Sequence, residues 1–395
     1  MIRISKLTNR ILYILSISLS LAFIINCDDE TDEEAVYVYP GPIGHCLPED
    51  SVSMPIDVQM VSIPPDGSLY HAAFPGGTEE WGEEDDVTLN DVQAYESSAG
   101  KSIAWVYFSH NWFRDLAFPT ETVNWIRSSG SVPFIRLMLR SSAEQFIDEP
   151  TFTIQKIVDG EFDGDLCAWA QSAKEYGDPL IVEFGTEVNG EWFSWNGSWN
   201  GGGKLDGYGN PTLADGPERF VDAYRHIIST LRAQGAMNIQ WVFHVDSEDI
   251  PEEDWNRFEN YYPGDNWVDW LGVSVYGAAE PSDDEWPSFR EKMDPIYDRL
   301  AALNNSAPIV VLEFGVTDGH SFGNQAQWAE EALTDMLELR WPRLTGFSWW
   351  NEGWENDDNP EHDTDMWIQH NHELEVVFQE LVGNNENVLG QAIFK

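Results

Sequence analysis

"PLIVEFG", residues 179–185, is an apolar run that carries one glutamate and ends at a glycine, and "PIVVLEFG", residues 308–315, repeats the pattern. Strands that are apolar almost throughout are typical of a parallel sheet whose outer face is covered by helices. Eight runs of this kind are predicted as strands: residues 68–74, 102–108, 132–138, 179–185, 239–245, 270–276, 308–315 and 346–350.

Helical patterns lie between these strands. Residues 217–236 and 324–341 space their apolar side chains three and four positions apart, and a glycine follows the last turn of the first. Eight strand–helix units match a (β/α)8 barrel better than an open doubly wound sheet. No glycine-rich phosphate-binding motif follows the first strand, which further disfavours a dinucleotide-binding fold. We therefore predict an α/β fold, a single (β/α)8 TIM barrel over residues 66–395.

The composition excludes some partners and favours others. The 395 residues include 69 Asp and Glu against 21 Lys and Arg, a net charge of −48, and no basic run is present, so we expect no nucleic acid partner. Many of the 19 tryptophans stand beside Gly, Asn or Asp, which is typical of loop-borne aromatic surface that stacks on a flat ligand, although core packing alone explains others. The sequence lacks zinc-ligand spacings, so we expect no metal and no cofactor. Calcium binding by the acidic loops stays open.

The N-terminus predicts export. Residues 1–26 contain three basic residues and then an apolar stretch, and Cys27 follows, as in a signal peptide. The ending "IINC" resembles a bacterial lipoprotein signal, although Asn26 departs from the small residue usual there. We expect a cell-envelope lipoprotein tethered to the membrane through Cys27, periplasmic or at the cell surface, or a secreted protein. A plain secretory peptide or an uncleaved anchor is the alternative. Residues 27–65, acidic and then rich in Pro and Gly, predict a solvated tether and barrel lead-in.

Two further cysteines remain, Cys46 and Cys167. An oxidising compartment would allow them to pair, but their separation in space cannot be read from the sequence. We expect the protein to be a monomer.

Candidate site residues stand where the apolar runs end, because the active sites of such barrels lie at the carboxyl ends of the strands. These residues are polar or aromatic, and their convergence on one rim favours a sugar site. They are His110, Trp112, Arg136, Glu187, His244, Tyr276, Glu313, Trp349 and Trp350.

The stretch "EFGTEVNGEWFSW", which begins at Glu183, contains three glutamates. Glu183 lies within the strand, and we expect it to be buried and paired with a barrel arginine such as Arg136. Glu187 lies where the strand opens into a loop and is the candidate for chemistry, whereas Glu191 is expected to be solvated. Glu313 is its candidate partner from the seventh strand, with a purely structural role as the alternative. Retaining glycoside hydrolysis needs two carboxyl groups about 5 to 5.5 Å apart.

Five motifs in this order resemble glycoside hydrolase family 26, the β-mannanase-type members of a clan of (β/α)8 retaining glycosidases. They are "GTEVNGEWFSWNG", "FVDAYRHIISTLRAQGAMNIQWVFHV", "DWLGVSVYG", "VLEFG" and "FSWWNE", and the resemblance extends over about residues 69–379. It implies that Glu187 is the acid/base, that Glu313 is the nucleophile, and that Tyr276 is hydrogen-bonded to the nucleophile. It also implies that His244, Trp192 and the two tryptophans of the eighth strand line the sugar subsites.

One residue departs from the family pattern. Thr186 stands where family members usually carry a histidine before the acid/base, which puts mannan specificity in doubt more than hydrolysis. We expect a retaining, endo-acting hydrolase of a β-linked polysaccharide of β-1,4-mannan type. The alternatives are β-1,3-xylan or mixed-linkage β-glucan as substrate, or a non-catalytic carbohydrate-binding surface lipoprotein. Sugar, linkage and endo or exo action are not decided by the sequence.

Overall fold

A computed structural model describes residues 37–55, 57–76, 84, 86–357 and 359–395. The predicted signal peptide and Cys27 lie outside these residues. Within the described ranges, no helix is both long and apolar enough to span a membrane.

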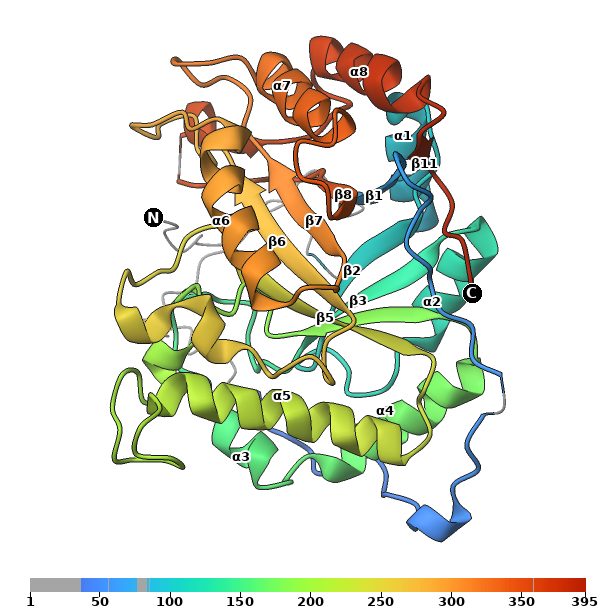
Figure 1. Ribbon diagram of the computed structural model, residues 1–395, viewed down its shortest axis with the longest axis vertical. Helices are drawn as coiled ribbons and strands as arrows, with labels where there is room; N and C mark the ends of the chain where they lie inside the picture. The colour runs from blue at the N-terminus through green and yellow to red at the C-terminus, as the bar shows by residue number, and fades with distance from the viewer. Residues whose placement is uncertain (1–36, 56, 77–83, 85, 358) are drawn as a thin grey trace, which may run out of the picture.

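The predicted barrel is confirmed (Figure 1). Its eight parallel strands pair in sequence order, and β1 pairs with β8 from Tyr70–Gly346 to Phe74–Trp350, which closes the sheet. The strands are β1 (Leu69–Phe74), β2 (Trp105–Asn111), β3 (Val132–Met138), β4 (Leu180–Phe184), β5 (Ile239–Asp246), β6 (Trp270–Tyr276), β7 (Ile309–Gly315) and β8 (Leu344–Trp350).

Helices cover the outside of the barrel, and α4 and α5 run along one flank (Figure 1). They are α1 (Leu89–Ala99), α2 (Thr120–Ser129), α3 (Ile154–Val158), α4 (Asp163–Tyr176), α5 (Asp215–Ala233), α6 (Phe289–Leu303), α7 (Gln325–Leu337) and α8 (His372–Phe378). The long helix α5 buries one apolar face, including Phe220, Ile227 and Leu231, against the strands. The connection from β5 to β6 contains two 3-10 turns, Asp254–Asn256 and Phe258–Tyr261, in place of an α-helix.

Strand boundaries differ from the prediction mainly at β2, which begins three residues later than expected and continues to Asn111. The amide of Ile103 donates to the Glu96 carboxylate at 3.0 Å, and the register with β3 starts at Trp105, opposite Val132. Three short strands were not predicted. They are β9 (Gly353–Trp354) and β10 (Thr364–Asp365), which pair with each other, and β11 (Val388–Leu389), which pairs with β1 outside the barrel.

The lead-in differs from the solvated tether that was predicted. From residue 37 onward its described part contacts α4 at several points, where the rings of Tyr37 and Tyr39 are partly buried, although most side chains of residues 40–55 are exposed. The Tyr39 ring lies 5.2 Å from that of Phe162, and the Tyr39 hydroxyl donates to Asp165 at 2.5 Å. A disulfide joins Cys46 to Cys167 of α4. The pairing left open by the sequence is therefore present.

The lower barrel is filled by side chains. Trp105 lies at its centre and donates from Nε1 to the Ser348 hydroxyl at 3.0 Å. Gly346 leaves room for this ring, because a Cβ there would lie 2.8 Å from the Trp105 ring and 3.0 Å from Tyr70. The packed floor confines any open site to the carboxyl ends of the strands.

Candidate active site

Glu187 follows β4 in an unusual backbone conformation. Its φ is 48°, and Gly185, two residues earlier, has a φ of 75°. A Cβ at Gly185 would lie 2.4 Å from the Phe220 ring, so only glycine fits this close turn. A glutamate held in the left-handed region costs roughly 1 kcal/mol or more, and such strain concentrates at functional sites. The turn raises Glu187 above the strand end.

Glu313 is aimed into the site by a bulge in β7. The register against β6 shifts at Leu312, which sets Glu313 beside Ser274. Gly272 makes this possible, since a Cβ there would lie 2.3 Å from the Leu312 side chain. The Tyr276 hydroxyl donates to Glu313 Oε2 at 2.9 Å, which is the contact that the resemblance implies.

Glu187 and Glu313 are both buried, and the charge of Glu187 disfavours ionisation of Glu313. Burial raises the pKa of Glu313 to about 7, with the guanidinium of Arg136 opposing the rise and the charge of Glu187 adding to it. Burial also raises the pKa of Glu187, and the charge of Asp246 adds to this rise. Coupled carboxyl groups of this kind lose their protons in two separate steps. At a pH between the two steps, the arrangement offers one proton donor and one carboxylate.

Glu183 is the buried, arginine-paired carboxylate that was predicted. Its Oε1 lies 3.7 Å from Arg136 Nε and accepts hydrogen bonds of 2.5 Å from Tyr107 and Thr186. Its Oε2 lies 2.9 Å from His244 Nδ1. Burial would raise the pKa of Glu183, but His244 and Arg136 outweigh it and hold the pKa below its usual value. Glu183 is thus an ionised counterion.

Arg136 is committed to carboxylates, so the structure contradicts its predicted contact with substrate. The side chain is almost completely buried, and its guanidinium lies 2.9 Å from Glu84, 3.7 Å from Glu183 and 3.7 Å from Glu313. The indole ring of Trp350 covers it at 5.2 Å. The positive charge of Arg136 therefore offsets the negative charge of these carboxylates from inside the barrel.

Sequence reasoning missed two carboxyl groups here. Glu84 belongs to the acidic run "EEWGEEDD", whose default interpretation is a solvated face, yet it accepts from Ser109 at 2.9 Å and pairs with Arg136. Glu352 is buried, accepts from Trp350 Nε1 at 3.1 Å, and has a pKa raised well above its usual value by burial and by the charge of Glu84. A signal existed for Glu352, because it lies two residues beyond Trp350, just past the end of β8, and the alternation of side chains along a strand predicts the same side for both.

Two predicted sugar contacts, His110 and Trp112, point away from the barrel interior. Tyr107 reaches Glu183 from inside the barrel, so alternation along β2 turns His110 to the outer face. Trp112 is fully buried against Phe152, with ring centroids 5.4 Å apart.

Trp349 and His244 also differ from the prediction. Trp349 packs outward, with its ring 5.0 Å from that of Phe314, and its Nε1 donates to the Met366 carbonyl at 2.8 Å. His244 faces inward but is completely buried, bonded to Glu183 and Ser274, so it does not reach a sugar.

The remaining predicted contacts lie beside the carboxyl pair. Trp192 donates from Nε1 to Glu187 Oε2 at 2.6 Å. The Trp350 ring stacks on Phe74 at 4.1 Å and Tyr276 bonds Glu313. Their contact with sugar stays a prediction. Among the described residues, no group of three or more His, Cys, Asp and Glu is arranged to hold a metal ion.

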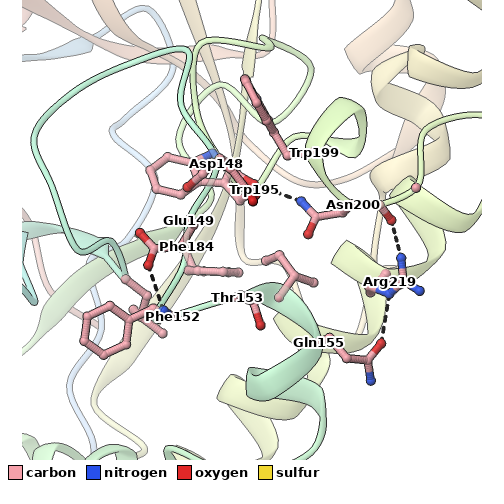
Figure 2. Close-up of a pocket in the computed structure, with 14 residues that line it drawn as sticks. Asp148, Glu149, Phe152, Thr153, Gln155, Phe184, Trp195, Trp199, Asn200 and Arg219 are labelled. Atoms are coloured by element: carbon pink, nitrogen blue, oxygen red, sulfur yellow. Dashed lines mark hydrogen bonds between the residues drawn. The ribbon is translucent and has the colours of Figure 1, made fainter. Parts of the chain in front are cut away.

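A separate hollow of about 360 Å³ lies outside the strands, between the segments that follow β3 and β4 (Figure 2). Trp195 and Phe184 line one side, and Arg219, which donates to Gln155 Oε1 at 2.9 Å, lines another. Neither Glu187 nor Glu313 lines it, so it is distinct from the carboxyl pair.

Comparisons with known proteins agree with the resemblance. The sequence profile of glycosyl hydrolase family 26 matches residues 138–374. Endoglucanase H of Acetivibrio thermocellus is 25% identical over 269 residues, which cover 67% of this chain and 27% of that protein. β-1,3-Xylanase TXYA of Vibrio sp is 22% identical over 218 residues, which cover 51% and 42%. This chain thus spans less than half the length of both relatives. A solved endo-β-1,4-mannanase double mutant of Cellulomonas fimi shares the fold, with a TM-score of 0.54 at 16% identity over 82% of this chain and 72% of that one.

Proposed function

The chain belongs to glycosyl hydrolase family 26, and from that premise we propose that it hydrolyses a β-linked polysaccharide with retention of configuration, by double displacement. The observation that carries the proposal is the pair of buried carboxyl groups, Glu187 and Glu313, at the carboxyl ends of β4 and β7. Both pKa values are raised by burial, and Glu187 adds to the rise at Glu313.

We assign the shared proton to Glu187. The charge of Asp246 disfavours a carboxylate there. Glu313 instead faces the Arg136 guanidinium at 3.7 Å and the Tyr276 hydroxyl at 2.9 Å, and both groups stabilise its ionised form. Although burial raises the pKa of Glu313 to about 7, these two partners favour the charge on Glu313 once the pair holds a single proton.

The two steps then use this proton in turn. The Glu313 carboxylate attacks the anomeric carbon while Glu187 gives its proton to the leaving oxygen, so the glycosidic bond breaks and a glycosyl ester forms. The Glu187 carboxylate next takes a proton from water, whose oxygen attacks the same carbon and releases Glu313. Each group returns to its starting state.

For the substrate we propose a β-1,4-mannan-type backbone, cut internally, on the strength of the motifs. A second candidate, mixed-linkage β-glucan or β-1,3-xylan, is favoured by Thr186. Its hydroxyl is buried and bonded to Glu183, so it does not replace the histidine expected at this position as a sugar contact. The names of the endoglucanase and β-1,3-xylanase relatives support this candidate. Retention of both carboxyl groups argues against a non-catalytic binding protein.

We also propose export and attachment to the membrane through Cys27, which rests on the sequence of the signal alone. Radiolabelled palmitate should enter the full chain expressed in a bacterium and should not enter a Cys27→Ser variant.

Reducing-sugar release from β-mannan, glucomannan, β-1,3-xylan, mixed-linkage β-glucan and cellulose tests the activity, with the chain from residue 28 onward. Glu187→Gln and Glu313→Gln should each abolish release from the polymer that the protein cleaves. Glu191→Gln is the matched control, because this glutamate of the same loop is partly exposed and should be dispensable. Activity that survives Glu313→Gln would refute the nucleophile, and an inverted anomer in early NMR spectra of the product would refute retention.

A further inference from the structure

The hollow between the segments that follow β3 and β4 has no part in the reaction proposed above (Figure 2). Its volume of about 360 Å³ lies within the range of small-molecule binding sites. The buried rings of Phe152, Phe184 and Trp195 line it, and so does Trp199, which is partly exposed. Aromatic rings beside a few polar side chains are the usual lining of a site for a small organic ligand.

The segments around the hollow are held in place by their own hydrogen bonds. The Asn200 side chain donates to the Ser194 carbonyl at 2.9 Å, and Trp199 donates from Nε1 to the Glu191 carbonyl at 2.8 Å. On the other segment, the carboxylate of Glu149 accepts from two backbone amides at 2.7 and 2.8 Å. The lining side chains therefore lose little conformational freedom when a ligand binds.

Two charged side chains line the hollow without neutralising each other. Arg219 donates from Nε to Gln155 Oε1 at 2.9 Å and from Nη1 to the Asn200 carbonyl. Its guanidinium lies 4.4 Å from the centre of the Tyr208 ring and, in the described part of the chain, has no ion pair. Asp148 is exposed and, among the same residues, has neither a hydrogen bond nor an ion pair. The other N–H groups of Arg219 and the carboxylate of Asp148 are thus available to a ligand.

These two charges decide between classes of ligand. Asp148 would repel an anionic ligand, and Arg219 would repel a cationic one. A neutral ligand rich in hydroxyl groups uses both, because a hydroxyl accepts from Arg219 and donates to the Asp148 carboxylate. The indole ring of Trp199 offers a flat apolar surface to the C–H groups of a sugar ring. A neutral saccharide therefore fits the lining better than a phosphate, a uronic acid or an amine.

We propose that the hollow is a second saccharide site, which binds a neutral sugar unit of a glycan chain without cleaving it. Trp195 and Trp199 belong to the same loop as Glu187, so a polymer bound here stays close to the carboxyl pair, which raises its effective concentration there. The inference does not rest on the proposed hydrolysis, because the hollow can bind a sugar whether or not the carboxyl pair cleaves it.

A titration followed at Trp199 tests the proposal. The protein is tryptophan-labelled Glu313→Gln, which leaves the probe intact, and the ¹⁵N NMR signal of the Trp199 indole is assigned from a Trp199→Phe variant. The probes are tetrasaccharides of β-1,4-linked mannose, β-1,4-linked glucose and β-1,3-linked xylose. At least one should shift this signal to saturation, and Asp148→Ala should raise its Kd about tenfold, because a hydrogen bond to a charged group is lost. Asp66→Ala, at another exposed aspartate, is the matched control and should leave the Kd unchanged.

Two results of this titration would overturn the proposal. The first is a Trp199 signal that no tetrasaccharide shifts, or that shifts with the same Kd in Asp148→Ala. The second concerns phenylalanine, a zwitterion whose two charges would also meet Arg219 and Asp148. If phenylalanine binds and the tetrasaccharides do not, the ligand class is wrong.

Affinity electrophoresis in gels that contain the soluble polymers of the panel tests the role of the ring. Trp199→Ala and Trp199→Phe both lose the hydrogen bond to Glu191, but only phenylalanine keeps a flat apolar ring. Trp199→Ala should therefore be retarded less than Trp199→Phe, and equal migration would contradict stacking on Trp199. If no polymer is cleaved but the tetrasaccharides bind at Trp199, the second site stands and the proposed hydrolysis fails.

Discussion

Replacing Glu313 by glutamine should change how the stability of the protein depends on pH. Burial raises the pKa of Glu313 from an ordinary value of 4.5 to about 7. A carboxyl group with a raised pKa contributes stability that is fully present below 4.5 and is lost as pH rises through 7. Glu313→Gln lacks this titration.

Linkage converts these two pKa values into a free energy. Between pH 5 and pH 8.5 the wild type should lose about 2.5 kcal/mol of unfolding free energy as the coupled pair gives up its proton, whichever of the two carboxyl groups carries it. The free energy of unfolding of Glu313→Gln, minus that of the wild type, should therefore increase by about this amount over the same range. Urea unfolding followed by tryptophan fluorescence at four or five pH values measures both proteins under identical conditions.

Glu183→Gln is the contrasting variant, because the same substitution on a different strand of the barrel should have the opposite effect on stability. The pKa of Glu183 is lowered, and its removal leaves His244 and Arg136 buried without their shared counterion. This variant should be less stable than the wild type at pH 7.5. A Glu313→Gln difference that stays within about 0.5 kcal/mol from pH 5 to 8.5 would refute the reasoning for the site.

Three further predictions concern the scaffold. Cys46→Ser removes a disulfide that spans 121 positions and should lower the unfolding free energy by about 4 kcal/mol, as measured by urea unfolding. Equal stability of wild type and variant would contradict a stabilising role of this disulfide. Gly346→Ala forces a Cβ to 2.8 Å from the Trp105 ring and should destabilise by about 1 to 3 kcal/mol, visible as a lower Tm, whereas an unchanged Tm would mean that the ring moves freely. Arg136→Met leaves three carboxylates without their cation and should destabilise the protein by about 3 to 5 kcal/mol at pH 7.5 but by less at pH 5. Unfolding followed by far-UV circular dichroism measures this. A loss of stability that is the same at both pH values would show that the charge of Arg136 is not its cause.

The barrel could be predicted because each strand can be recognised from its own residues. A strand that is buried on both faces is apolar almost throughout, as in residues 179–185 and 308–315. The carboxyl pair was predictable for a related reason, because both glutamates stand near a glycine that ends such a run.

The direction of side chains was harder to predict. The expected end of β2 at residue 108 put His110 in a loop, whereas the strand continues to Asn111 and turns His110 outward. Glu84 looks solvated in its acidic run, and only the fold brings Arg136, 52 positions away, within 2.9 Å of it. Contacts between distant segments, such as His244 with Ser274, cannot be predicted from the residues that flank either partner in the sequence.

If Cys27 carries a lipid, the contact of the lead-in with α4 limits the distance between the barrel and the membrane. About ten residues separate Cys27 from Tyr37, whose ring is in contact with Phe152. A chain segment of this length extends at most about 35 Å. Phe152 belongs to the segment that follows the carboxyl end of β3, on the same end of the barrel as Glu187 and Glu313. A domain held this way would work within one protein diameter of the bilayer, on polysaccharide chains that come to the cell surface.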